Sequence, residues 1–85
     1  MLKDESNHLT SVLEPLKNDE LLETLKNYYE CGMKLDKVAE KIYTHKNTVK
    51  YRMHRIQEQM GVDLKNPDDN FRVYLAILAM KLKSQ

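Results

Sequence analysis

Two amphipathic patterns meet at a short polar break between residues 36 and 61, and this stretch constrains the fold most strongly. The first pattern places Val38, Ala39 and Ile42 on one side. The second repeats apolar residues at spacings of four, three and four, namely Val49, Met53, Ile56 and Met60. Such spacings follow one face of an α-helix. The stretch therefore predicts two short helices joined by a tight turn, a helix-turn-helix, over residues 36–60.

The opposite face of the second helix, residues 46–60, is cationic and carries no carboxylate from Lys46 to Gln57. A solvated helix usually mixes charge signs, because oppositely charged side chains four residues apart attract each other. A face of lysine, arginine, asparagine, threonine and tyrosine favours an anionic partner, since these side chains can hydrogen-bond phosphates or base edges. The plainer interpretation is a solvated basic face on an ordinary bundle helix.

The charge of the chain is segregated along its length, although the net charge of the 85 residues is only +1. Residues 1–32 contain three Lys and seven Asp or Glu. Residues 33–60 contain seven Lys or Arg and three Asp or Glu, so the basic part coincides with the helix pair. This distribution is typical of the electrostatic footprint of a nucleic-acid-binding domain.

Further helical signals extend on both sides of the helix pair, and we find no β pattern of useful length. A short first helix is predicted from Leu9, Val12, Leu13 and Leu16, with Pro15 near its end. Asn18 is the expected cap of a second helix that Gly32 closes. Asp36 is the expected cap of the third, which runs to about Tyr43. The fold class predicted is all-α, a compact five-helix domain containing a helix-turn-helix.

The fourth and fifth helices have the clearest boundaries. The fourth is expected to start at Lys46, with His45 or Thr44 as its cap, and to end at Gly61. The run Asn66-Pro67-Asp68-Asp69 offers a cap, a first-turn proline and acids against the helix dipole, so it predicts the start of the fifth. Five large side chains line one face of that helix: Phe71, Tyr74, Leu75, Leu78 and Leu82.

Other classes of function find little support in the residues. Cys31 is the only cysteine, which excludes an intrachain disulfide and suggests a reducing compartment. The three histidines show no metal-ligand spacing, and no phosphate loop or nucleophile motif is present. No apolar run approaches the ~18 residues of a membrane span. We therefore expect a cytoplasmic, non-enzymatic domain with no cofactor, no metal, no membrane association and no small-molecule site.

Residues 13–80 resemble the C-terminal DNA-binding domain of PucR-type transcription regulators, a group that includes purine-catabolism and carbohydrate-diacid regulators of bacteria. The specific stretches are LLETL at 21–25, THKNTVKYRMHRI at 44–56 and GVDLKNPDD at 61–69. The resemblance implies a helical domain that places residues 45–55 on DNA. It also implies that the chain, one domain over 1–85 with its core at 9–83, is the C-terminal part of a longer regulator.

Tyr43 departs from a common feature of helix-turn-helix sequences, which often have glycine at this position of the turn. A left-handed conformation here costs a tyrosine roughly 1–2 kcal/mol. Either that strain is accepted or the turn is remodelled.

We interpret the chain as a sequence-specific DNA-binding domain that inserts helix 46–60 into the major groove of double-stranded DNA. Asn47, Thr48 and Tyr51 are the candidates for base edges. The candidates for phosphate contacts are His45, Lys46, Lys50, Arg52 and Arg55. A useful operator requires two half-sites, so a homodimer is expected in the full-length regulator. The alternative is a helical protein–protein interaction module without DNA binding.

Overall fold

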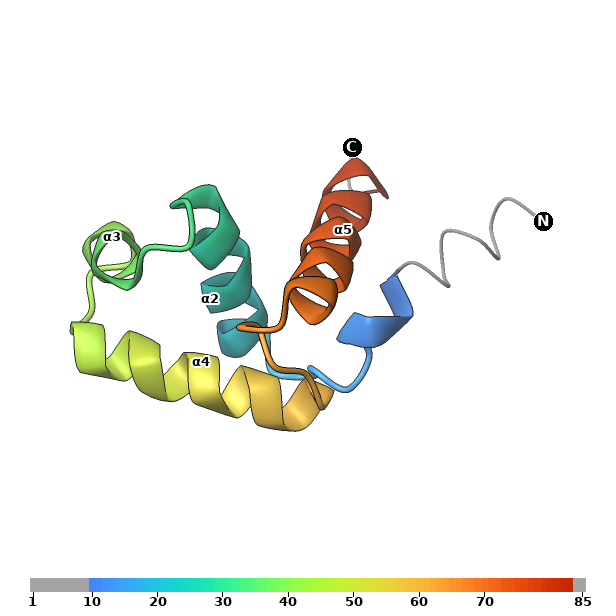
Figure 1. Ribbon diagram of the computed structural model, residues 1–85. Helices are drawn as coiled ribbons and strands as arrows, with labels where there is room; N and C mark the ends of the chain where they lie inside the picture. The colour runs from blue at the N-terminus through green and yellow to red at the C-terminus, as the bar shows by residue number, and fades with distance from the viewer. Residues whose placement is uncertain (1–9, 84–85) are drawn as a thin grey trace.

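Four α-helices and one short 3-10 helix make up residues 10–83, the part of the chain that the computed structural model describes (Figure 1). The elements are η1 (Ser11–Leu13), α2 (Asp19–Glu30), α3 (Leu35–Lys41), α4 (Lys46–Met60) and α5 (Pro67–Lys83). No strand occurs within these residues, so the all-α fold class is confirmed. None of their helices is long and apolar enough to cross a membrane.

The short first helix predicted from the sequence is, within the described residues, the 3-10 helix Ser11–Leu13. Pro15 has no backbone N–H and cannot donate to the carbonyl four residues earlier. The chain instead makes tighter bonds, from the Glu14 amide to the Ser11 carbonyl at 3.1 Å and from the Leu16 amide to the Leu13 carbonyl at 2.9 Å. Leu13 and Leu16 still reach the core. Leu9 lies outside the described residues.

The ends of α2 follow the sequence prediction, whereas those of α3 are shifted. The Asn18 side chain accepts a hydrogen bond from the Leu21 amide at 3.0 Å, which caps α2 as expected. Gly32 follows the helix with a φ of 66°. The cap of α3 is Lys34 rather than Asp36, which lies in the first turn, and the helix ends at Lys41. Asp36 there faces the positive end of the helix dipole.

The connection between α4 and α5 is held by side-chain hydrogen bonds to backbone amides. The Asn66 side chain accepts from the amides of Asp68 at 2.9 Å and Asp69 at 3.2 Å, so the predicted cap is confirmed. Asp69 in turn accepts from the Asp63 amide at 3.0 Å, and this hydrogen bond, followed by the ion pair with Arg72, lowers the pKa of Asp69. These hydrogen bonds fix the conformation of the connection and the position at which α5 begins.

The core lies where α4 meets α2 and α3, and it continues along the inner side of α5. In Figure 1, α4 runs along one edge of the molecule, α3 lies across its first turn, and α5 rises away from its far end. Leu25, Val38, Val49, Ile56 and Val73 have no exposed surface at all. These residues come from four different helices, so the core joins the helix pair to the rest of the domain.

The five large side chains predicted to share one face of α5 do share it, but that face points away from the core. Their exposed fractions run from 36% for Leu75 to 72% for Leu82. The core side of α5 is built instead by the smaller residues Val73, Ala76 and Ile77. Tyr74 borders the exposed face and stacks on Tyr29 of α2 with ring centroids 4.9 Å apart.

Candidate nucleic-acid interface

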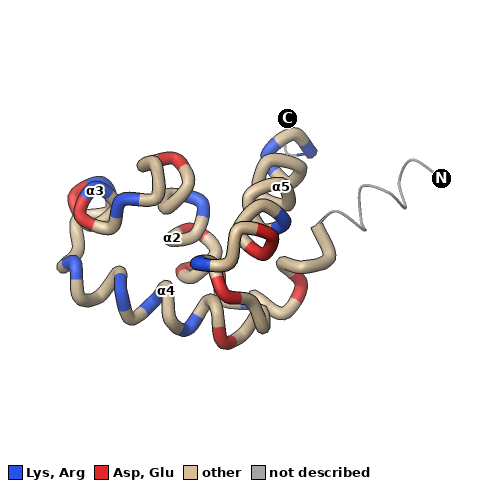
Figure 2. The backbone as a smooth tube through the Cα atoms, viewed as in Figure 1, with Lys and Arg blue, Asp and Glu red and all other residues tan. Residues whose placement is uncertain are grey.

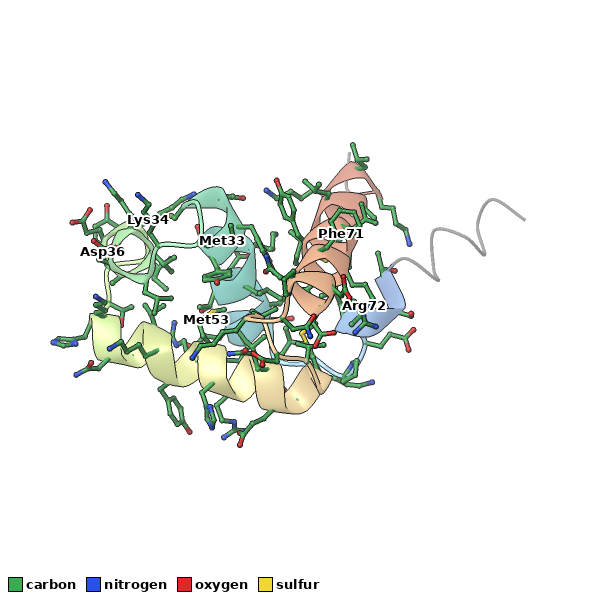
Figure 3. The ribbon with its side chains drawn as sticks, viewed as in Figure 1. Met33, Lys34, Asp36, Met53, Phe71 and Arg72 are labelled. Carbon is green, nitrogen blue, oxygen red and sulfur yellow. The ribbon has the colours of Figure 1, made fainter. Side chains whose placement is uncertain are left out.

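The inner face of α4 fixes the rotation of the helix about its own axis. Val49 and Ile56 are completely buried, and Met53 and Met60 are nearly so, which confirms the predicted apolar face. Figure 3 shows Met53 pointing from α4 toward α2. Because four anchors over three turns face the core, the opposite side of α4 must face solvent.

The first turn of α4 is capped by His45. Its Nδ1 accepts a hydrogen bond from the Asn47 amide at 3.1 Å, and its carbonyl accepts from the Thr48 amide at 3.0 Å. The other end of α4 terminates at Gly61, which has a φ of 67°. Both boundaries agree with the sequence prediction. Since the cap acceptor belongs to His45, the first turn does not depend on the Asn47 side chain for capping.

The turn between α3 and α4 contains a residue in the left-handed conformation. Tyr43 has a φ of 56°, so the strain of a left-handed tyrosine is accepted rather than avoided by remodelling. The Thr44 amide donates to the Ala39 carbonyl at 2.9 Å and closes the turn. Ala39 itself is buried at the crossing of α3 and α4, where a small side chain lets the two helices approach.

The outer face of α4, defined as its solvent-facing side from Lys46 to Arg55, gathers most of the predicted site residues. Thr48 is half-buried, and the exposed members are Lys46, Asn47, Lys50, Tyr51 and Arg55. The capping residue His45 is exposed beside them. Figure 2 shows basic positions spaced along α4 from its start, followed by an acidic position nearer its end. The Arg55 guanidinium donates to the Tyr51 hydroxyl at 3.3 Å, which links two neighbouring turns of this face.

Arg52 is the predicted site residue that the structure separates from the others. Its guanidinium pairs with the Glu20 carboxylate at 3.2 Å and donates to the Thr24 hydroxyl at 3.4 Å, both on α2. Only 21% of its side chain is exposed. Arg52 therefore ties α4 to α2. The local sequence around Arg52 carries no signal for a partner 28 to 32 residues away.

The cationic stretch of α4 ends where His54 pairs with Glu58, one turn later, at 3.3 Å. On α3, Lys41 is already engaged with Glu30 at 2.6 Å. Figure 3 shows Lys34 and Asp36 on the side of α3 that faces away from α4. On α4 itself, exposed positive charge is present at Lys46, Lys50 and Arg55.

Comparison with known families identifies the same stretch of chain. Residues 21–79 match the family model described as the PucR C-terminal helix-turn-helix domain. The chain belongs to that family. The matched range begins inside α2 and runs almost to the end of α5, so it contains the helix pair and the core that positions it. The resemblance noted in the sequence is confirmed, and the domain is the helix-turn-helix of a bacterial transcription regulator family rather than an enzyme.

Several curated relatives are transcription regulators. The chain is 36% identical over 77 residues to the purine catabolism regulatory protein of Bacillus subtilis, covering 89% of the chain and 14% of the relative. It is 36% identical over 64 residues to the proline-responsive transcriptional activator PutR of the same organism, covering 75% and 16%.

A third relative comes from another species. The chain is 32% identical over 77 residues to the carbohydrate diacid regulator of Escherichia coli, covering 86% of the chain and 20% of the relative. The chain thus spans a fifth or less of the length of these three relatives. No solved structure matches it.

Proposed function

We propose that this domain binds duplex DNA sequence-specifically by inserting the first half of α4 into the major groove, as part of a longer bacterial transcription regulator. The observation that carries the proposal is the outer face of α4. It is exposed, cationic, free of carboxylates from Lys46 to Gln57, and held in one orientation by the buried face behind it. The family is one of helix-turn-helix domains from regulators, which supports the same function.

The dimensions of α4 suit a groove-inserted helix. Its 15 residues span about 22 Å, and the major groove is about 12 Å wide, enough to admit one α-helix. A recognition helix contacts base edges mainly with its N-terminal residues. At this end α4 presents Asn47 and Thr48, with Tyr51 one turn further on. We assign base contacts to these three side chains.

The remaining side chains of the site are assigned to phosphates. Lys46, Lys50 and Arg55 are exposed and can reach the DNA backbone on either side of the inserted helix. His45 contributes as the cap that holds the first turn. Arg52 can contact a phosphate only if its guanidinium binds Glu20 and the phosphate together, or breaks the ion pair with Glu20. Its main contribution is therefore to position α4 on α2.

One copy of the domain reads only a few base pairs, so a specific operator requires two copies. In helix-turn-helix dimers the half-sites lie about 34 Å apart, one turn of DNA. The proposal therefore includes a homodimer in the full-length regulator, bound to a site with two-fold symmetry.

The decisive experiment is a titration with mixed-sequence duplex DNA over a range of salt concentrations. Each phosphate contact contributes about −0.9 to the slope of log affinity against log salt. Four lysine and arginine contacts predict a slope of about −3.6 per monomer, and about −2.7 if Arg52 stays with Glu20. Lys50→Ala should reduce the slope by about one and weaken all sequences alike.

Lys65→Ala serves as the matched control, because this exposed lysine lies in the connection between α4 and α5. It removes the same charge and should leave the slope unchanged. A slope near zero for the wild-type domain would overturn the proposal. In that case the exposed apolar face of α5 favours the second candidate function, a protein–protein interaction module that does not bind DNA.

A further inference from the structure

Four large apolar side chains form a stripe on the outer side of α5, opposite the side that packs on the core. This outer stripe consists of Phe71, Leu75, Leu78 and Leu82, with exposed fractions of 63%, 36%, 39% and 72%. At about 100° per residue, the four fall within roughly 60° of one another. Isolated exposed apolar residues are ordinary, whereas a continuous apolar surface marks an interaction site.

The spacing within the outer stripe is that of a helix–helix seam. Steps of four, three and four residues follow the repeat of about 3.5 residues that packs one helix along another. The steps also read the same from both ends. Two antiparallel α5 helices related by a two-fold axis would therefore place Phe71 against Leu82 of the partner subunit, and Leu75 against Leu78 of the partner subunit. Such a contact is self-complementary.

The charges at the two ends of α5 favour the antiparallel arrangement over the parallel one. The first turn carries Asp68 and the last turn carries Lys83, whereas Asp69 pairs with Arg72 and Lys81 pairs with Glu30 within the chain. Antiparallel pairing sets the acidic end of each helix beside the basic end of the other and also opposes the two helix dipoles. Parallel pairing would bring like charges together at both ends.

We propose that the outer stripe of α5 is the surface through which two copies of this domain pair, with their α5 helices antiparallel. This deepens the homodimer included in the proposed function, and rests on it. The stripe shares no residue with α4, so pairing leaves the residues assigned to DNA outside the seam. In Figure 1, α5 extends away from α4, which agrees with this separation.

The first test is the mass of the domain by sedimentation equilibrium between about 10 µM and 1 mM. The average mass should rise with concentration toward that of a dimer. Leu75→Lys places a charge in the middle of the seam and should weaken association by about tenfold or more. Tyr43→Lys introduces the same charge at a side chain that is 96% exposed on a turn outside α5, and should leave association unchanged. Circular dichroism checks that both variants fold.

The second test distinguishes the two directions by disulfide formation. In a Cys31→Ala background, Phe71→Cys and Leu82→Cys are prepared separately and then mixed under oxidising conditions. Residues 71 and 82 lie about 16 Å apart along the helix, whereas a disulfide requires Cα atoms within about 7 Å. Antiparallel pairing predicts crosslinks between the two different variants and few within either one. Their different masses identify the products.

Three results would overturn the inference. A monomer at every concentration, or a Leu75→Lys variant that associates like the wild type, would remove the outer stripe from self-association. Rapid crosslinking of Phe71→Cys with itself would show parallel helices. DNA binding is scored separately by its salt slope. If the domain dimerises but its DNA affinity does not depend on salt, only the DNA-binding proposal is overturned. If the domain stays monomeric but its DNA affinity falls with salt as expected, only the proposed interface is overturned.

Discussion

The two longest helices, α4 and α5, both pack on the core but expose chemically different surfaces to solvent. Each buries one side in the same core, α4 through residues such as Val49 and Ile56 and α5 through Val73 and Ile77. Away from the core, α4 presents lysine, arginine and polar side chains, whereas α5 presents phenylalanine and leucine. The first surface suits a polyanion, and the second suits another apolar surface.

The comparison of α4 with α5 shows under which condition an apolar sequence pattern identifies the side of a helix that faces the core. In α4 only one side is apolar, so periodicity alone locates the buried face correctly. In α5 both sides are apolar, and the larger residues lie on the outside. A sequence pattern reports which residues share a face, but it does not report whether that face meets the core or another molecule. The neighbours Ile77 and Leu78 illustrate this point, with exposed fractions of 1% and 39%.

The largest expected effect is a difference in the free energy of unfolding between alanine variants of Ile77 and Leu78. Ile77→Ala should lower the free energy of unfolding by about 2–5 kcal/mol, because it leaves a cavity in a packed site. Leu78→Ala should lower it by less than about 1 kcal/mol at low protein concentration, where the outer side of α5 meets only solvent. Urea denaturation of both variants at about 1 µM provides the measurement.

Equal losses of stability in the two variants would contradict the orientation of α5. The comparison is matched, since each variant removes the same number of carbon atoms from adjacent positions on one helix. Any difference in helix propensity between isoleucine and leucine is a few tenths of a kcal/mol, too small to account for the expected gap.

A larger side chain at Ala39 tests how closely α3 and α4 pack against each other. Ala39→Leu should destabilise the domain by about 1–3 kcal/mol, because the added carbons have no space at the buried crossing of α3 and α4. Thermal unfolding is the measurement. Glu40→Leu, at the next and exposed position of α3, is the control and should change stability by about 0.5 kcal/mol or less. An unchanged melting temperature for Ala39→Leu would contradict the close crossing.

Specificity depends on the outer face of α4, and Asn47 tests it. Asn47→Ala should reduce discrimination at one base pair by about 1–3 kcal/mol, because an asparagine amide can pair bidentately with adenine. Folding should change little, since His45 provides the cap. Selection of bound sites from a random duplex pool with both proteins is the measurement. Identical selected motifs would exclude Asn47 from base readout.

Much of the site could be predicted because its determinants are local. The cap at His45, the end at Gly61 and the buried face between them all arise from residues within one or two turns of each other. The cationic outer face then follows from helix geometry. The position of Arg52 could not be predicted, since its ion pair with Glu20 depends on how α2 packs across α4.

The fold was predictable to the same extent and for the same reason. Strong local signals at Asn18 and Asn66 placed the starts of α2 and α5 correctly. The short first helix is a 3-10 helix within the described residues, because Pro15 cannot donate the backbone hydrogen bond that would continue an α-helix. The outward face of α5 could not be inferred, because only the packed structure shows that three smaller residues already fill the core side.

The smallest expected effect concerns Glu30, which connects the helix pair to α5. Its carboxylate pairs with Lys41 of α3 at 2.6 Å and with Lys81 of α5 at 2.8 Å. Hydrogen bonds from Lys41 and Lys81 lower the pKa of Glu30 from 4.5 to about 2. Because the folded pKa is depressed, the stability it contributes is present above about pH 4.5 and is lost as the pH falls toward 2.

Glu30→Gln should therefore lower stability at pH 7 by less than about 1 kcal/mol, since about a third of the side chain is exposed and solvent screens the pair. The gap between wild type and variant should narrow as the pH falls from 4.5 to about 2. Urea denaturation at pH 7 and pH 3 measures both values. Glu40→Gln, an exposed glutamate on α3, controls for the loss of one negative charge and should show a smaller gap at either pH. A gap that is the same at pH 7 and pH 3 would mean that the Glu30 charge does not link α3 to α5.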